Sequence, residues 1–268
     1  MSKSKTLSAT RQGIKWVVLA SLVSSDEIEV KTSNGNSKMG KIISFNITAG
    51  GEPYVRSDGL ELSDFKGSCD GVCEGCQNGC YARNGEMRFK TVQLNNARNY
   101  ALAMLNPKEY KRQVIEILNH VKDDIPVRIH ECGEFFSLEY MAIWLDIIEM
   151  FPAKTFYTYT KHFDFVRVLK ARILSLSNLR MNLSGYRENL DALKAEFPEF
   201  AIFLWDDSNI IGDNCGIEIP HDLRCPAVNC HGKMNHGVKC INCGKCFKSE
   251  YAGKVIACYD HSKGVKHI

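Results

Sequence analysis

Twelve cysteines stand out among the 268 residues, and ten of them fall into two groups. Four lie between Cys69 and Cys80, and six lie between Cys225 and Cys258. Reduced thiolates grouped in this way are ligands for zinc or for iron–sulfur clusters. The apolar run at 14–23 contains Lys15, lacks a small-residue cleavage site and is too short for a membrane span. We therefore expect a cytoplasmic protein whose thiols stay reduced and bind metal.

The first group has the spacing of an iron–sulfur loop. Cys69, Cys73 and Cys76 are spaced C-x3-C-x2-C, and Cys80 follows four residues later. Three thiolates on one short loop can hold three irons of a 4Fe–4S cluster and leave the fourth iron open to a small molecule. The intervening glycines allow the backbone to fold tightly around such a cluster. The alternative is a structural zinc ion closed by all four thiolates.

The second group has the spacing C-x2-C-x2-C at Cys240, Cys243 and Cys246, with Cys225 as a fourth ligand from further away. This set suits either a second 4Fe–4S cluster or a closed zinc site. We expect the metal at this site to have a structural role, because the region has too few large apolar residues to fold without a bound metal. Further candidate ligands are Cys230, His231, His236 and Cys258.

The order of secondary structure between the two groups predicts the fold class. Short apolar segments alternate with helical patterns, which is typical of βαβ units and a parallel sheet. The predicted strands are 41–48, 126–130, 155–160, 179–183, 200–205 and 216–219. The predicted helices are 87–104, one from Pro107 capped by Asn106, one capped by Ser137, 163–174 and 186–197.

Six right-handed βα units predict an α/β protein with a partial (β/α)6-type barrel. The predicted organisation is an unassigned N-terminal segment at 1–40, the barrel at 41–224, and a small cysteine-rich metal-binding appendage at 225–268. In such folds the active site lies at the carboxyl ends of the strands. His130 and Cys132 follow the strand at 126–130 and are the catalytic candidates. The alternatives are a satisfied core histidine and an inert buried thiol.

The cysteine triplet and the residues after the later strands together resemble the radical S-adenosylmethionine superfamily. Gly133-Glu134 matches most of the superfamily's Gly-Gly-Glu, with Cys132 in place of the first glycine. The resemblance implies that a 4Fe–4S cluster binds S-adenosylmethionine and that one electron, from a donor such as a flavodoxin or ferredoxin, cleaves a carbon–sulfur bond. It also implies cofactor-binding roles for Glu134, Lys161, Asn182 and Ser184.

A second resemblance is to the phage gene-product-eighty-eight family. It is carried by C-x6-C-x3-C-Y-A at Cys69, Cys76 and Cys80, followed by Arg-Ile-His, Gly-Glu-Phe-Phe-Ser and Tyr-Thr-Lys. This pattern leaves Cys73 as the extra cysteine, whereas the superfamily triplet leaves Cys80. Both patterns include Cys69 and Cys76.

The sequence thus predicts an iron–sulfur enzyme that cleaves S-adenosylmethionine to start radical chemistry on a substrate that these residues do not specify. The alternative is a non-enzymatic zinc protein that binds nucleic acid or a protein partner through its C-terminal region. Seven lysines there outnumber the two acidic residues, Glu250 and Asp260. A solvated basic surface explains the same lysines, and a net charge of +3 is too small to require a nucleic acid. A third hypothesis is a barrel that holds a cluster but no longer binds S-adenosylmethionine.

Overall fold

The chain divides into two compact units. The first unit comprises Met1–Ser33, Ser44–Lys122 and His130–Phe151, and the second comprises Asn34–Ile43, Asp123–Ile129 and Pro152–Ile268. The computed structural model describes residues 6–11, 14–19, 28–36, 38–50, 53–55, 61–69, 89–206, 221–227, 235 and 237–259.

A seven-stranded sheet has the strand order β11-β10-β9-β8-β7-β4-β3. Its strands are β3 (Thr32–Ser33), β4 (Ile43–Phe45), β7 (Val127–Ile129), β8 (Phe156–Thr160), β9 (Leu179–Gly185), β10 (Ala201–Asp206) and β11 (Val255–Tyr259). All pairs from β7 to β11 are parallel, and β3 is antiparallel to β4. The predicted α/β class with a mainly parallel sheet is confirmed.

Six strands of this sheet, β4 and β7 to β11, lie side by side in their order along the chain. Five of them fall within or beside the predicted segments, which are rich in aromatic and β-branched residues that favour strands. The sixth is β11, which comes from the C-terminal cysteine-rich region. The strand predicted at 216–219 lies outside the described residues.

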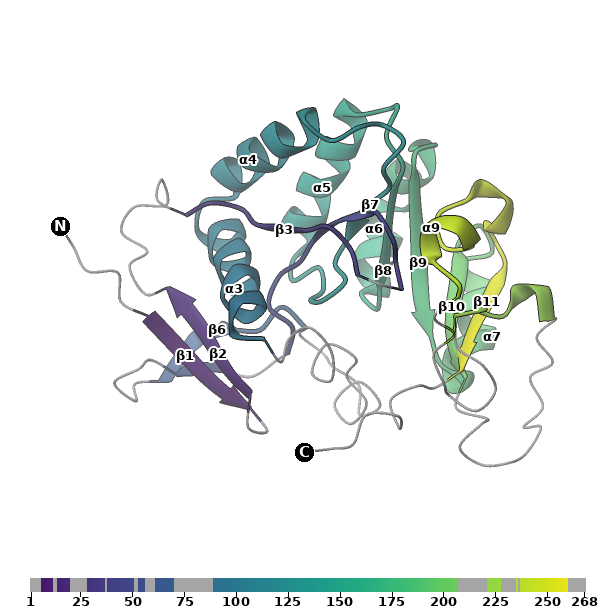
Figure 1. Cartoon of the computed structure of the whole chain (residues 1–268). Helices are drawn as coiled ribbons and strands as arrows, with labels where there is room; N and C mark the ends of the chain where they lie inside the picture. Colours follow the sequence, from purple (N-terminus) through teal and green to yellow (C-terminus); the bar gives the residue numbers. More distant parts are fainter. Residues whose placement is uncertain are drawn as a thin grey trace. The chain divides into compact units, whose positions relative to one another are not determined.

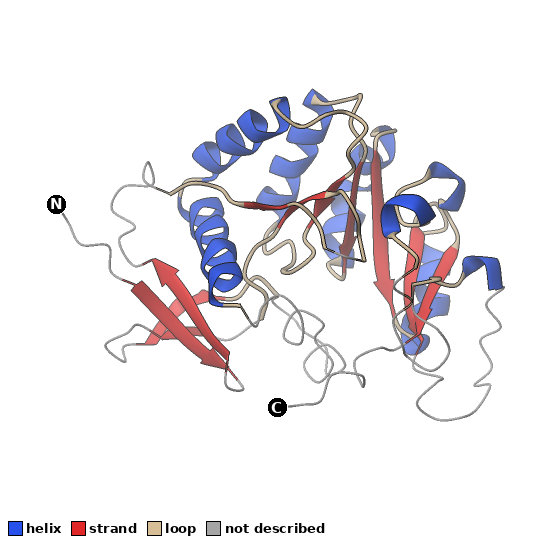
Figure 2. Cartoon of the chain, in the orientation of Figure 1, coloured by secondary structure: helices blue, strands red, loops and turns tan. Residues whose placement is uncertain are grey.

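In the second unit, helices and the cysteine-rich segment lie on opposite sides of the strands. Figures 1 and 2 show α6 (Phe163–Ser175) and α7 (Leu190–Glu196) behind the sheet, and α9 (Cys240–Cys243) in front of it. Tyr157 of β8 packs against Phe247 of the cysteine-rich segment, with ring centroids 5.3 Å apart. The cysteine-rich segment is therefore packed on the front face of the sheet.

The first unit contains the longer helices α3 (Lys90–Leu105), α4 (Pro107–Asn119) and α5 (Leu138–Met150). Its hairpins are β1 (Thr6–Arg11) with β2 (Ile14–Leu19) and β5 (Pro53–Val55) with β6 (Glu61–Lys66). The core centres on Trp144, whose ring meets Phe45 edge-on at 5.3 Å and Tyr110 at 6.2 Å. Ser137 caps α5 through a 3.1 Å bond from Tyr140 N, as predicted.

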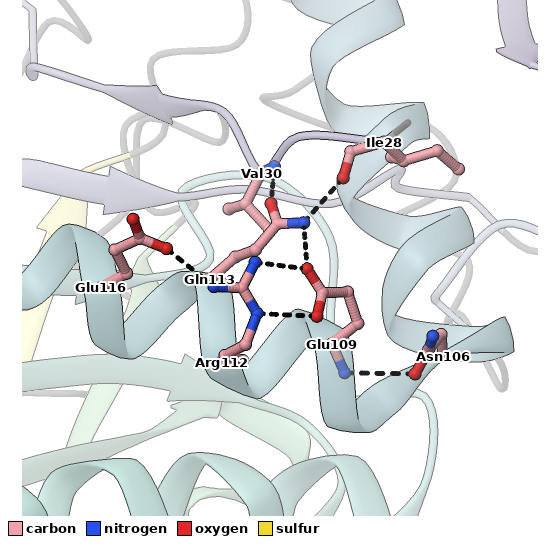
Figure 3. Close-up of polar contacts among 7 residues, drawn as sticks. All are labelled: Ile28, Val30, Asn106, Glu109, Arg112, Gln113 and Glu116. Carbon is pink, nitrogen blue, oxygen red and sulfur yellow. Dashed lines mark hydrogen bonds and ion pairs between the residues drawn. The ribbon is translucent and has the colours of Figure 1, made fainter. Parts of the chain in front are cut away.

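Helix α4 begins as its sequence predicts. The side chain of Asn106 accepts a 3.1 Å hydrogen bond from Glu109 N (Figure 3). Pro107 occupies the first helical position. Proline fits there because its missing N–H would have no intrahelical partner. The cap satisfies one of the free amides at the helix start.

The first turn of α4 also fixes a neighbouring segment. Glu109 binds Arg112 through both carboxylate oxygens, at 2.8 and 2.6 Å, and accepts a 2.8 Å bond from Gln113 (Figure 3). Gln113 in turn accepts from Val30 N at 2.7 Å and donates to Ile28 O at 2.8 Å. These bonds hold residues 28–30 along the helix.

Replacing the cap tests this helix start. We expect Asn106→Ala to lower the free energy of unfolding by about 1 kcal/mol, because a capping oxygen is lost. Asn119→Ala is the matched control, since Asn119 is exposed at the other end of α4 and should change stability by less than about 0.5 kcal/mol. Urea denaturation of both variants measures the difference, and equal stability of the two would contradict the assignment of the cap.

None of the helices in the described ranges is both long enough and apolar enough to cross a membrane.

Candidate functional site

The chain leaves β7 through a tight, buried turn in the first unit. His130 has φ of 62° and Gly133 has φ of 96°, so both lie in the left-handed region. The side-chain oxygen of Asn46 accepts hydrogen bonds from Glu131 N at 2.6 Å and from Cys132 N at 3.3 Å. Asn46 thus fixes the backbone of the turn from the end of β4.

The first cysteine group starts beside this turn. Ser68 Oγ donates to Thr48 O at 2.6 Å and accepts from Glu134 N at 2.9 Å. The next residue is Cys69, whose N–H donates to Gly50 O at 2.9 Å. Cys69 and Glu134 are therefore held near each other by one serine. Cys73, Cys76 and Cys80 lie outside the described residues.

His130 is packed among aromatic rings. It is 3% exposed, and its Nε2 lies 3.0 Å from the hydroxyl of Tyr140. The ring of Phe135 meets it at 4.7 Å. Burial raises the pKa of Tyr140 above its ordinary value, so this hydroxyl stays protonated. His130 is therefore buried among aromatic rings with Nε2 beside the Tyr140 hydroxyl, and its catalytic role stays a prediction.

The second cysteine group surrounds a cavity of about 40 Å³ in the second unit. Thiols reach it from the segment after a short 3₁₀ helix (His221–Leu223), from α9, and from the turn that follows α9. The lining of the cavity includes Cys225, Cys240, Cys243, Cys246, Arg128 and Tyr159.

Cys258 of β11 lies next to Cys225 and is 5% exposed. The Cys258 thiol donates a hydrogen bond to Cys225, and this bond, with help from Lys38 and Lys245, lowers the pKa of Cys225 to about 6. The same bond and burial raise the pKa of Cys258. At neutral pH this pair therefore holds a thiolate at Cys225 and a thiol at Cys258.

Burial dominates the other thiols at the cavity. It raises the pKa of Cys246 to about 12, although the hydroxyl of Tyr159 donates to this sulfur. It also raises the pKa of Cys240, which Lys38 and Arg128 partly offset. Without a further cation, Cys240 and Cys246 are thus protonated.

The cofactor-binding candidates of the later strands lie in the second unit. Asn182 is fully buried in β9, and its amide donates to Thr158 O and Cys246 O, each at 3.0 Å. Ser184 is also on β9, opposite Phe203 of β10. Lys161 follows β8, with its ammonium 5.6 Å from the centre of the Tyr186 ring. Asn182 therefore links β9 to the cysteine-rich turn.

Within the part of the chain that the structure describes, no group of three or more His, Cys, Asp or Glu side chains stands ready to hold a metal ion. The seven described cysteines form no disulfide bond with one another. One cavity is shared by four of the predicted ligands, Cys225, Cys240, Cys243 and Cys246. These four residues belong to the second unit, whereas Cys69 belongs to the first.

Comparison with known proteins identifies the relatives of this chain. The family model described as "Gene product 88" matches residues 23–249. The chain belongs to the gene product 88 family. Two curated relatives are the Gene 88 proteins of Mycobacterium phages D29 and L5. They are 26% and 25% identical over 75% of this chain, which corresponds to 88% and 87% of their own lengths. No solved structure matches the chain.

The gene product 88 resemblance predicted from the sequence is confirmed, and two of its segments form the turn after β7. Arg-Ile-His ends at His130, and Gly-Glu-Phe-Phe-Ser runs from Gly133 to the cap of α5 at Ser137. Tyr-Thr-Lys runs from the last residues of β8 to Lys161. The family's sequence pattern thus marks the carboxyl ends of two neighbouring parallel strands.

Three residues of these sites were not predicted. Asn46 and Ser68 position the turn after β7, and Tyr159 binds Cys246. Asn46 had a detectable signal, because it is a polar residue in the apolar strand segment at 41–48. Ser68 had only its place before Cys69, and Tyr159 is one of several aromatic residues on its strand.

Proposed function

We propose that this chain is an iron–sulfur enzyme that cleaves S-adenosylmethionine reductively and so starts radical chemistry. The observation that carries the proposal is the link from Cys69 through Ser68 to the backbone of Glu134. It brings the first thiol of the C-x3-C-x2-C loop to the turn that holds the acidic residue expected to bind the cofactor's amino group.

The strand order supports the same proposal. Six strands in chain order, β4 followed by β7 to β11, form the sheet that a partial (β/α)6 barrel requires. Cys69 comes after β6 in the chain, but its neighbour Ser68 is bonded to Thr48 O just beyond β4, and the turn with Glu134 follows β7. Both are at carboxyl ends of parallel strands, where this class of fold places its active site.

The residues fit the proposed group by their chemistry. Soft thiolates are the ligands of iron–sulfur clusters, and Cys69 is partly exposed at the start of a glycine-rich loop. When bound, a 4Fe–4S cluster with one open iron supplies the electron that breaks a carbon–sulfur bond of S-adenosylmethionine. Glu134 would bind the ammonium group of that ligand, and Asn46 and Ser68 hold the backbone that presents Glu134.

The remaining predicted roles follow from this proposal. Lys161 and Ser184 are proposed contacts of S-adenosylmethionine at β8 and β9, and Cys132 is a proposed substrate contact. Asn182 makes its two bonds to the backbone, so we propose a positioning role for it. A flavodoxin or ferredoxin is the proposed electron donor.

Release of 5′-deoxyadenosine tests the proposal. Anaerobic, reconstituted and chemically reduced protein is expected to convert S-adenosylmethionine to 5′-deoxyadenosine and methionine. Glu134→Gln should weaken S-adenosylmethionine binding about tenfold or more, because a hydrogen bond between charged groups is worth about 1.5–3 kcal/mol. Glu139→Gln is the matched control on the exposed first turn of α5 and should bind normally. Protein that holds a full cluster but neither binds nor cleaves S-adenosylmethionine would refute the proposal.

A further inference from the structure

We propose that Cys225, Cys240, Cys243 and Cys246 bind one structural zinc ion at the cavity that they line in the second unit. This inference is independent of the proposed enzyme activity, which concerns the first cysteine group. It also selects zinc at a place where the sequence left zinc and a second iron–sulfur cluster as alternatives.

The geometry of the thiols supports one shared ion. All four side chains line the same cavity, although they come from two separate stretches of chain, Cys225 and the segment from Cys240 to Cys246. A cysteine changes direction through one torsion with three staggered wells, so modest rotation can bring four sulfurs to an ion. Zinc accepts this four-sulfur set in tetrahedral structural sites, with bonds of about 2.3 Å.

The cavity has room for an ion between the thiols. Its volume is about 40 Å³, more than the ~10–15 Å³ that one water molecule needs by the same measure. Tyr159 and Phe247 also line the cavity, and they are held by contacts with Cys246 and Tyr157. A single ion therefore needs less rearrangement of this lining than the eight heavy atoms of a 4Fe–4S cluster.

Charges around the cavity suit a four-thiolate zinc site, which carries a net charge of −2. Arg128 lies at the cavity with its guanidinium 5.0 Å from the Tyr159 ring. Lys245 donates to Asp222 O and, at 2.9 Å, to Arg224 O, which keeps it beside Cys225. Lys38 lies near Cys225 and Cys240. Three cations therefore surround the thiols and can offset the charge of the complex.

The backbone at α9 is shaped like a metal-binding turn. Cys240 and Cys243 are three residues apart on one helical turn, so they lie on the same side. Gly244 ends the turn with φ of 72°, and a Cβ there would come within 2.4 Å of the Lys248 side chain. Glycine takes this left-handed conformation without strain, and the turn that it closes joins Cys240 and Cys243 to the following Cys246.

Cys258 is assigned a positioning role rather than a ligand role. It is buried and does not line the cavity, and its thiol donates to Cys225. Such a bond orients a ligating sulfur, as outer hydrogen bonds do at metal sites.

A zinc ion here would also hold residues 36–40 against the C-terminal region. Cys240 N donates to Lys38 O at 2.9 Å, and Ile241 N donates to Met39 O at 3.0 Å. Met39 is buried with Ile42 and Tyr157, against the partly buried Ile241. The ion would therefore join two stretches about 200 residues apart in the sequence.

Zinc content of full-length variants tests this inference. Wild-type protein is expected to carry one zinc per chain at this site, and Cys225→Ser, Cys240→Ser, Cys243→Ser and Cys246→Ser should each lose one equivalent by elemental analysis. Asn242→Ser, at the exposed position between Cys240 and Cys243 on α9, is the matched control and should keep it. The difference between wild type and variant counts this site alone, whatever metal the first cysteine group holds.

Cobalt spectroscopy of the wild-type protein tests the site without requiring that the ligand variants fold. Cobalt exchanged into wild-type protein should show the charge-transfer and ligand-field bands of a tetrahedral four-thiolate site, and these bands should persist in Asn242→Ser. Iron and sulfide bound by the C-terminal cysteines, or full zinc in all four ligand variants, would overturn the assignment. Loss of zinc with 5′-deoxyadenosine release intact would uphold this site separately from the proposed enzyme activity.

Discussion

Cys76→Ala is expected to reduce the iron content of anaerobically purified protein to near zero and to abolish 5′-deoxyadenosine release. Cys76 belongs to both cysteine triplets that the first group permits, so neither can form without it. A cubane cluster held by three thiolates cannot be kept by two. The zinc of the C-terminal site should remain at one equivalent, because its ligands are separate.

The neighbouring cysteines act as matched comparisons for Cys76. If the cluster uses Cys69, Cys73 and Cys76, then Cys80→Ala should keep its iron and Cys73→Ala should not. The reverse result selects Cys69, Cys76 and Cys80, the set in the gene product 88 pattern. Full iron content and activity in Cys76→Ala would show that both triplets are wrong.

Gly133→Ala is expected to lower the free energy of unfolding by about 3 kcal/mol or more. Gly133 has φ of 96°, which costs a residue with a side chain about 1–3 kcal/mol. An added Cβ would also lie 2.5 Å from Ile47 Cγ1 and 2.7 Å from Ile47 O, so the backbone at Ile47, two residues beyond β4, would have to move. Because this turn presents Glu134, binding of S-adenosylmethionine should fall as well.

Urea denaturation and circular dichroism measure this effect. Gly237→Ala is the control, since a Cβ there would meet only Asn235 Oδ1, at 3.4 Å, and the position does not have a positive φ. It should change stability by less than about 0.5 kcal/mol. Equal stability of Gly133→Ala and wild type would mean that the turn after β7 does not have the geometry described above.

Much of the fold is predictable because its signals are local. Asn106 and Ser137 each accept a bond from the amide three residues ahead, and both helix starts follow from that chemistry alone. The strand Phe156–Thr160 is a run of aromatic and β-branched residues that hardly fits another element. The match of family and fold class rests on such segments.

Strand β11, the sixth strand of the series, was not predicted because the cysteine- and lysine-rich composition around it indicated a separate appendage. Val255–Tyr259 reads Val-Ile-Ala-Cys-Tyr and follows a stretch rich in cysteine and lysine, which predicted a separate appendage. Only its pairing with β10, from Ile202 with Val255 to Asp206 with Tyr259, shows that it is a sheet strand. Such a pairing joins residues about 50 apart and leaves no local pattern in the sequence.

The candidate sites divide in the same way. The cysteine spacings are visible in the sequence because ligands on one loop must be close together. Ser68 with Glu134 and Cys225 with Cys258 are pairs that only the fold brings together. Ser68 and Glu134 are 66 residues apart, and Cys225 and Cys258 are 33 residues apart.

The most direct test of the central claim is the iron, sulfide and zinc content of wild-type protein purified without oxygen, together with its absorbance spectrum. We expect about four irons with four sulfides, the content of one cubane cluster, and one zinc per chain. Zinc without iron or sulfide, in protein that cannot be reconstituted with either, would contradict the enzyme proposal. That result would favour a zinc protein that binds nucleic acid or a protein partner.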